Sequence, residues 1–260
     1  ADVSFAIHPG ETLALVGESG SGKSVTSLTL MGLHARTSQA QVTGQAWFVQ
    51  RDGRKVDLLA MPEAEKRTLR GNELAMIFQE PMTSLNPVLT VGEQIAESAR
   101  LHLKMDRRAA LAHARRMLEL VEIPAAAQRV HEYPHQLSGG MRQRAAMART
   151  LAVDPIVLLM DEPFSALDAQ TKMILQQDLA RTVAEHQKTV LFITHDLTEA
   201  VALSDRILVM SERPGTIVEE IVVDIPGRDN PMARRKHPSV GDYVSRLMDL
   251  LKLDAQTDVH

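Results

Sequence analysis

Short apolar runs alternate with stretches of helical periodicity along most of this chain. The apolar runs predict strands over residues 11–16, 74–78, 156–160, 190–193 and 207–210. Helical patterns follow over residues 24–33, 139–152, 169–185 and 197–202. Since strands that alternate with helices form parallel sheets, the pattern predicts an α/β fold with a mostly parallel sheet.

Three stretches depart from this alternation. Residues 42–60 alternate around Gly44 and Gly53, which predicts a small antiparallel sheet. Residues 91–121 have a helical period that stops before a proline, which predicts an inserted helical subdomain. Residues 226–238 are polar and bounded by prolines, as in a linker, and a modestly amphipathic helix is expected over 240–253.

Composition and charge narrow the function classes. The formal net charge of -4 gives no general attraction to a phosphodiester backbone, and the short basic clusters are typical of solvated surfaces, so we expect no nucleic-acid partner. The absence of cysteine excludes disulfides, thiolate metal sites and iron–sulfur clusters. No apolar run approaches the ~20 residues that span a bilayer, so we expect any membrane link to come through a partner.

A glycine-rich segment links the first predicted strand to the first predicted helix. It fits the phosphate-loop pattern G-x-x-x-x-G-K-[ST] and comprises Gly17, Glu18, Ser19, Gly20, Ser21, Gly22, Lys23 and Ser24. Glycines let successive backbone N–H groups face a polyphosphate, and the helix N-terminus adds positive dipole. Lys23 would reach the β- and γ-phosphates, and Ser24 would offer its hydroxyl to Mg²⁺. The segment therefore predicts ATP and Mg²⁺ as ligands.

Two carboxylates follow the apolar run 156–160. Asp161 and Glu162 stand at the carboxyl end of this strand, the edge where open α/β sheets bind ligands. Alone, such a pair is typical of a strand that reaches solvent. Beside a phosphate loop, Asp161 is placed to hold Mg²⁺ through water, and Glu162 to polarise the water that attacks the γ-phosphate.

The segment 137–144 lies between these motifs and reads Leu-Ser-Gly-Gly-Met-Arg-Gln-Arg. It resembles the signature of ABC ATPases. The resemblance implies that Ser138, Gly139 and Gly140 close over ATP held by a second subunit, an anion site made of backbone N–H groups and a helix dipole. Met141 replaces the glutamine usual in the family and leaves the Ser-Gly-Gly core intact. Alone, Ser-Gly-Gly is more often a linker or a helix cap.

Three further family elements occur in the expected order. Gln79 follows the strand 74–78, Asp168 ends the sequence Ser-Ala-Leu-Asp shortly after Glu162, and His195 follows the strand 190–193. By resemblance, Gln79 contacts Mg²⁺ or the attacking water, Asp168 links the two subunits, and His195 holds the γ-phosphate. Each element is weak alone, and their shared order supports the assignment.

The resemblance implies a RecA-like P-loop NTPase fold, in which a small antiparallel β subdomain and an inserted helical subdomain accompany the mostly parallel sheet. We expect residues 1–79 and 150–225 to form the nucleotide-binding core, 80–149 the helical subdomain with the signature, and 226–260 a C-terminal tail. The family's adenine-stacking aromatic belongs upstream of a strand that here begins near Val3, and Phe5 is too close to the phosphate loop to replace it. Because the sequence begins without Met, we expect a longer or processed chain.

The two ends of the chain resemble different branches of the family. Residues 75–87 and 133–137 look like di- and oligopeptide importer ATPases, including the glutathione type. Residues 161–170 and 210–215 look like nitrate, sulfonate and taurine importer ATPases, as in a mosaic or a chimera. We rank peptide import first and nitrate- or sulfonate-like import second.

The resemblance further implies an ATP-hydrolysing importer subunit that works as a dimer on the cytoplasmic face of the inner membrane. Its partners would be a second ATPase subunit, identical or not, membrane permease subunits docking near Glu80–Ala96, and indirectly a solute-binding protein. The rival interpretation is a soluble ABC ATPase that acts on DNA or ribosomes. Repair members carry a long coiled coil before the signature and translation members carry two cassettes, whereas this chain has one cassette and a compact helical lobe.

Overall fold

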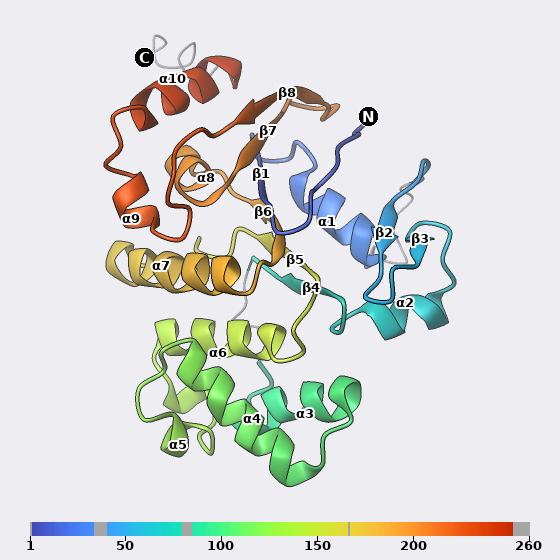
Figure 1. The fold of residues 1–260 in the computed structure, drawn as a ribbon, viewed down its shortest axis with the longest axis vertical. Helices are drawn as coiled ribbons and strands as arrows, with labels where there is room; N and C mark the ends of the chain where they lie inside the picture. The colour runs from blue at the N-terminus through green and yellow to red at the C-terminus, as the bar shows by residue number, and fades with distance from the viewer. Residues whose placement is uncertain (1, 34–40, 80–84, 166, 252–260) are drawn as a thin grey trace.

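The computed structural model describes residues 2–33, 41–79, 85–165 and 167–251, and six strands within them form one central sheet (Figure 1). In spatial order the strands are β4 (Leu74–Ile77), β5 (Val157–Asp161), β6 (Thr189–Ile193), β1 (Thr12–Gly17), β7 (Arg206–Met210) and β8 (Ile217–Val222). Neighbours from β4 to β7 are parallel, and β8 runs antiparallel to β7. The predicted α/β fold with a mostly parallel sheet is confirmed.

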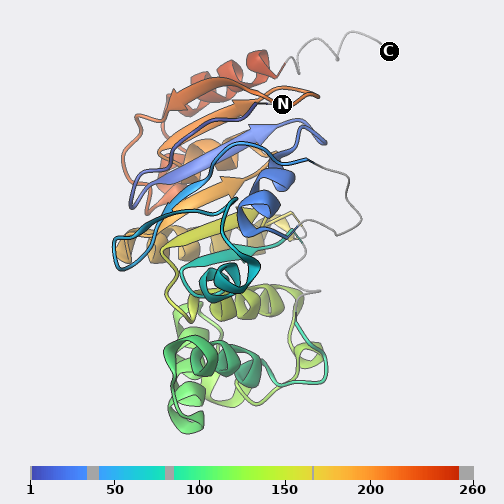
Figure 2. The same cartoon turned by 90° about the vertical axis from the view of Figure 1, so that its right-hand side faces the viewer.

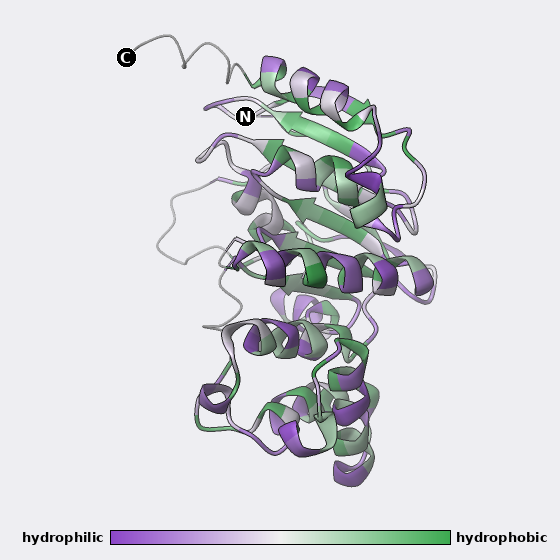
Figure 3. Ribbon diagram, turned by 90° about the vertical axis from the view of Figure 1, so that its left-hand side faces the viewer, coloured by the Kyte–Doolittle hydropathy of each residue, from purple (hydrophilic) through white to green (hydrophobic). Residues whose placement is uncertain are grey.

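Both faces of the parallel strands are buried, whereas the edge strand β8 is partly exposed, and Figure 3 shows the strands as largely hydrophobic. In β1, Leu13 and Leu15 join one apolar cluster, while Ala14 and Val16 join the other. The first cluster includes side chains of α1 (Lys23–Met31), α2 (Glu63–Leu69) and the antiparallel pair β2 (Trp47–Val49) and β3 (Lys55–Asp57). The second includes side chains of α7 (Ala169–Glu185), α8 (Leu197–Leu203) and α10 (Val240–Leu250). This two-sided burial explains why the strands read as continuous apolar runs.

A helical lobe extends from the β4 side of the sheet (Figure 2). Its elements are α3 (Val91–Leu103), α4 (Arg107–Leu120), α5 (Ala126–Arg129), η2 (Pro134–Gln136) and α6 (Gly139–Leu151). The helical period predicted over 91–121 is divided because Lys104 ends α3 in the left-handed conformation, with φ of 56°, and Asp106 caps α4 by accepting from Ala109 N at 2.8 Å. Fully buried alanines, Ala99 and Ala110 among them, let the helices approach closely.

Some elements were not predicted, and some ends differ by one to three residues. The predicted helix 240–253 corresponds to α10 (Val240–Leu250), and its last two residues lie outside the described part of the chain. The helix α2, the edge strand β8 and the short helix α9 (Pro231–Arg234) lie in stretches whose pattern did not predict them. Residues 2–8 form no strand in the structure, although a strand was predicted to begin near Val3; Val3, Phe5 and Ile7 instead pack against the cluster of Leu13 and Leu15. The predicted small antiparallel sheet is confirmed by β2 and β3.

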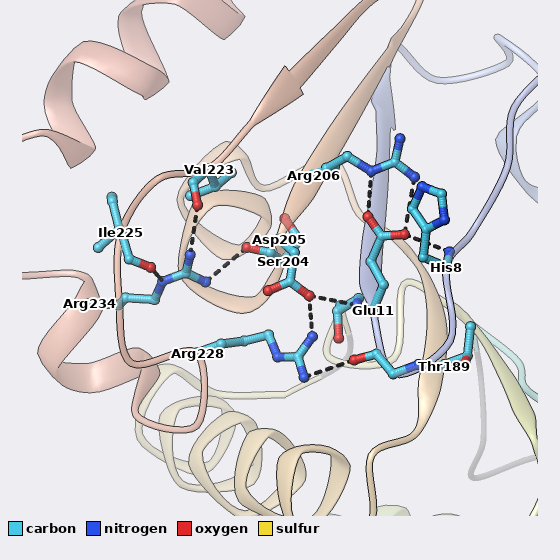
Figure 4. Close-up of polar contacts among 12 residues, drawn as sticks. His8, Glu11, Thr189, Ser204, Asp205, Arg206, Val223, Ile225, Arg228 and Arg234 are labelled. Carbon is cyan, nitrogen blue, oxygen red and sulfur yellow. Dashed lines mark hydrogen bonds and ion pairs between the residues drawn. The ribbon is translucent and has the colours of Figure 1, made fainter.

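The stretch 226–238, predicted as a linker, is held against the core by buried arginine contacts (Figure 4). Arg234 is only 3% exposed, and its guanidinium donates to backbone carbonyls on both sides of the β7–β8 hairpin. The acceptors are the carbonyls of Ala202, Ser204, Val223 and Ile225. Arg228 pairs with Asp205, whose carboxylate also accepts from Thr12 N at 2.8 Å. Val223 and Ile225 directly precede this stretch, but Ala202, Ser204 and Asp205 lie 23 to 32 residues from their arginine partners in sequence, so no local pattern indicates those contacts.

Replacing Arg234 should therefore destabilise the fold. Arg234→Met keeps a long apolar stem but deprives four buried carbonyls of a charged donor, which we expect to cost about 3 kcal/mol in free energy of unfolding. Arg246→Met is the matched control, because Arg246 is exposed and pairs with Glu219 at the surface, where the change should stay below ~0.5 kcal/mol. Urea unfolding followed by circular dichroism measures both changes. If Arg234→Met unfolded at the same urea midpoint as Arg246→Met, the role given to Arg234 would be contradicted.

Candidate active site

The phosphate-loop segment forms the turn between β1 and α1, as predicted. Gly20 and Gly22 have φ of 82° and 109°, in a region that side-chain-bearing residues rarely adopt. At Gly17, an added Cβ would lie 2.8 Å from the carbonyl oxygen of Met210. Glycine is thus required here both for backbone conformation and for close packing against the end of β7.

Lys23 begins α1 with its side chain turned back into the loop. Its Nζ donates to the carbonyl oxygens of Gly17 at 2.7 Å and Glu18 at 2.8 Å. Burial lowers the pKa of Lys23, and the negative charges of Glu162 and Asp161 act against this shift. Ser21 Oγ is also buried and has no hydrogen-bond partner among the described residues. A loop that holds a buried cation and an unpaired hydroxyl is suited to an anion with many acceptor oxygens.

Ser24 and Asp161, two of the three residues predicted to hold Mg²⁺, are in direct contact. Ser24 Oγ donates to Asp161 Oδ1 at 2.9 Å across the space between α1 and the end of β5. Asp161 is 5% exposed; burial raises its pKa, whereas the hydrogen bond from Ser24 lowers it. The pair offers a hydroxyl and a carboxylate oxygen, which are the donor types that Mg²⁺ prefers.

Glu162 is the point at which the three predicted catalytic residues meet. Its Oε2 lies 3.0 Å from Nδ1 of His195 and accepts from Nε2 of Gln79 at 3.4 Å. Its φ of 45° lies in the left-handed region, so the chain turns sharply as it leaves β5. The Glu162 N–H donates to the carbonyl of Ile193 at 2.9 Å, which ties this turn to the end of β6.

The signature segment lies on a second surface, with Ser138 as the N-cap of α6. Ser138 Oγ accepts from Met141 N at 3.3 Å, and Asp168 caps α7 by accepting from Thr171 N at 3.0 Å. Both caps border one open hollow of about 390 Å³, lined by Ser138, Gly139, Gly140, Met141, Arg144, Leu167, Asp168 and Thr171. No hydrogen bond in the described part of the chain joins these residues to the phosphate loop, so the predicted binding residues form two groups.

A turn that the sequence did not single out for a role braces the phosphate loop. It spans residues 211–216 after β7, and Arg213 Nε donates to the carbonyl of Gly20 at 2.8 Å. Gly215 packs so closely that an added Cβ would lie 1.9 Å from the carbonyl oxygen of Ser21. The Pro214-Gly215 dipeptide signals a turn at this place, but no local signal shows which segment the turn contacts.

Comparison with known proteins decides the family. The sequence profile of the family described as ABC transporter matches residues 1–165. The chain belongs to this family. A glutathione import ATP-binding protein, GsiA of Pectobacterium atrosepticum, is 52% identical over 209 residues, which cover 80% of this chain and 34% of that protein. A putative peptide import ATP-binding protein of Brucella melitensis biotype 1 is 46% identical over 218 residues, which cover 84% of this chain and 64% of that protein.

This ABC chain thus spans about a third of the length of the glutathione relatives that it matches. Among solved structures it is similar to the ATP-binding cassette MJ0796 in a dimeric, post-hydrolysis state bound to ADP and Pi. The TM-score is 0.71 at 28% sequence identity, over 85% of this chain and 89% of that one. The predicted P-loop NTPase fold is confirmed by this likeness. Within the described residues, no helix has the length and apolarity to cross a membrane.

The contact between Gly215 and the phosphate loop leads to a prediction for this ABC cassette. In Gly215→Ala the new methyl group overlaps the Ser21 carbonyl, so the loop has to move, and we expect nucleotide affinity to fall about tenfold, or ~1.4 kcal/mol. Gly241→Ala in α10 is the control, because a Cβ there meets nothing within 4 Å. Titration with a fluorescent ATP analogue measures both; an unchanged Kd in Gly215→Ala would contradict the bracing role.

Proposed function

We propose that this chain is the ATP-hydrolysing subunit of an ABC importer, with peptides as the first-ranked cargo. The observation that carries the proposal is the meeting of Gln79, Glu162 and His195 beside the phosphate loop and the Ser24–Asp161 pair. A nucleotide-binding protein without hydrolysis would need the loop but not a carboxylate held between an amide and an imidazole. The family and the cassette fold support the same activity.

The residues of the loop fit a nucleoside triphosphate with a bound divalent cation. Residues 17–24 would hold the phosphates through backbone N–H groups, with the Lys23 ammonium and the Ser21 hydroxyl inside the same loop. Ser24, Asp161 and Gln79 would hold Mg²⁺. When bound, Mg²⁺ would offset phosphate charge.

Glu162 would act on the attacking water. In hydrolysis the water oxygen forms a bond to the γ-phosphorus, the bond from that phosphorus to the β–γ bridging oxygen breaks, and the products are ADP and phosphate. The Glu162 carboxylate would accept the hydrogen bond, and then the proton, of that water. Gln79 and His195 orient the carboxylate through its Oε2, and His195 would also hold the γ-phosphate.

The hollow at the signature favours a dimer. Ser138, Gly139, Gly140 and Asp168 border a surface separate from the chain's own phosphate loop. Two helix N-termini, those of α6 and α7, begin beside this surface and would attract negative charge. We therefore infer that the hollow faces nucleotide held by a second ATPase subunit, identical or not. The dimeric state of the similar MJ0796 cassette supports this arrangement.

A membrane permease would dock near Glu80–Ala96, of which residues 80–84 lie outside the described part. The described part of this stretch exposes apolar side chains ahead of α3: Val88 is 75% exposed, and Leu89 is also exposed. The relatives named as glutathione and peptide import ATP-binding proteins support a role in import. From the resemblance to importer ATPases we infer a permease partner with an associated solute-binding protein, on the cytoplasmic face of the membrane. Nitrate- or sulfonate-like import is the second candidate, because residues 161–170 and 210–215 resemble that branch.

Glu162→Gln tests the catalytic assignment. The amide cannot accept the proton of the attacking water, so we expect turnover to fall at least about a hundredfold while ATP still binds and a closed dimer accumulates. Lys23→Ala is the contrasting variant, because loss of the loop cation should weaken nucleotide binding itself. Phosphate release and size-exclusion chromatography with ATP measure both, and turnover of Glu162→Gln at the unsubstituted rate would refute the assignment.

Capture from detergent-solubilised membranes tests the importer role. Tagged protein should retain a polytopic permease, identified by mass spectrometry, and Val88→Glu should reduce that retention because it places a charge in the proposed docking surface. Val222→Glu is the control, since Val222 is exposed on β8. Retention of ribosomes or DNA, without a permease, would favour the soluble ABC ATPase instead.

A further inference from the structure

A buried carboxylate lies beneath the loop that carries His195. Glu199, in the first turn of α8, is 3% exposed, and both of its carboxylate oxygens have partners. Oε1 accepts from Gln176 Nε2 at 2.8 Å and pairs with Lys172 Nζ, both from α7. Oε2 accepts from Thr194 Oγ1 at 2.7 Å. The carboxylate therefore joins α7 to the end of β6.

The two residues that flank His195 are both fixed by this cluster. Thr194 Oγ1 donates to Glu199 and accepts from the Asp196 N–H at 3.0 Å. Asp196 Oδ1 accepts from the Glu199 N–H at 3.0 Å, and its Oδ2 pairs with Lys172 Nζ at 3.0 Å. His195 thus sits on a backbone segment that is held on both sides.

The side chain of His195 is exposed, and in the described part of the chain it makes few contacts that would fix its orientation. It is 65% exposed, and its hydrogen-bond partner among the described residues is Glu162. An exposed imidazole with one side-chain contact can adopt several rotamers, so its own packing does not fix its position. Its distance to the Glu162 carboxylate therefore depends on the backbone that Thr194 and Asp196 fix.

The cluster contains one cation, Lys172, and two carboxylates, Asp196 and Glu199, and each carboxylate is ion-paired with the lysine. Burial acts to lower the pKa of Lys172, but hydrogen bonds and charge from Glu199 and Asp196 outweigh it and raise the pKa. Burial likewise acts to raise the pKa of Asp196, yet the Glu199 N–H and Lys172 lower it. Desolvating one cation and two carboxylates is costly, and well-packed apolar residues could fill such a site at less cost. The ions are therefore weak evidence for stability, and what they demonstrably do is fix the groups on both sides of His195.

We propose that Glu199 and Lys172 are positioning residues for His195: Glu199 fixes the backbone on both sides of the imidazole through Thr194 and Asp196, and Lys172 ties that backbone to the first turn of α7. Because Asp168 is the N-cap of α7 and lines the signature hollow, the cluster also joins the loop of His195 to the edge of that hollow. This inference rests on the proposed ATPase function and adds Glu199 and Lys172 to the residues on which hydrolysis depends.

A pair of substitutions at Thr194 separates positioning from packing. Thr194→Val keeps the shape of the buried side chain but removes the hydroxyl, whereas Thr194→Ser keeps the hydroxyl and removes a methyl group. We expect Thr194→Val to lower kcat about tenfold, because a displaced His195 orients Glu162 poorly, while the Kd for an ATP analogue changes less than about threefold. Thr194→Ser should retain most of kcat. Glu219→Gln on β8, an ion-paired glutamate outside the cluster, is the control.

The outcomes distinguish this inference from the function on which it rests. If the unsubstituted protein does not hydrolyse ATP, the proposed function fails. If it does, and Thr194→Val has the same kcat, or Thr194→Ser loses as much as Thr194→Val, the inference is overturned. Should Thr194→Val melt at a much lower temperature, Lys172→Met provides the second measurement. A lower kcat with unchanged Kd in that variant supports the positioning role, and an unchanged kcat overturns it.

Discussion

The parallel pairing of β4, β5, β6 and β1 is the constraint on which the candidate site depends. In a parallel sheet every strand ends at the same edge, and here the register keeps those ends level: Ile77 pairs with Met160, and Ile193 lies between Asp161 and Leu15. Gln79, Glu162, His195 and the phosphate loop each begin within one or two residues of such an end. Reversing any one strand would send its residue to the opposite edge. Apolar packing on both faces of the sheet therefore assembles a polar site that no local sequence contact could build.

Much of this arrangement could be predicted because the signals were local. The strand, glycine turn and helix around residues 17–24 are adjacent in sequence, and their order alone indicates a phosphate loop. Asp161 and Glu162 could be placed because an apolar strand leads directly to them. The meeting of Gln79 with Glu162 and His195 follows from a parallel sheet once the strands are recognised. The pairing order of the strands, with β6 between β5 and β1, was not contained in any single segment.

What could not be predicted depends on contacts between distant segments. The turn at 211–216 reads as an ordinary proline–glycine turn, and only the fold brings Arg213 and Gly215 against Gly20 and Ser21. Lys172 and Glu199 look like solvated helix charges, although packing buries Glu199 and holds the half-buried Lys172 against it. The strand β8 reads Ile-Val-Glu-Glu-Ile-Val, without the strict alternation of apolar and polar residues that marks a half-buried strand. Pairing with β7 decides its conformation.

The four carbonyls bound by Arg234 belong to the segments that enter and leave the β7–β8 hairpin. Through these hydrogen bonds the guanidinium of Arg234 connects three parts of the chain: the end of α8, the β7–β8 hairpin and α9. If α9 detaches, the edge strand loses a fastening, and if the edge strand opens, Arg234 loses half of its acceptors. We therefore expect the last strand of the sheet and the segment that follows it to open together, as one cooperative unit.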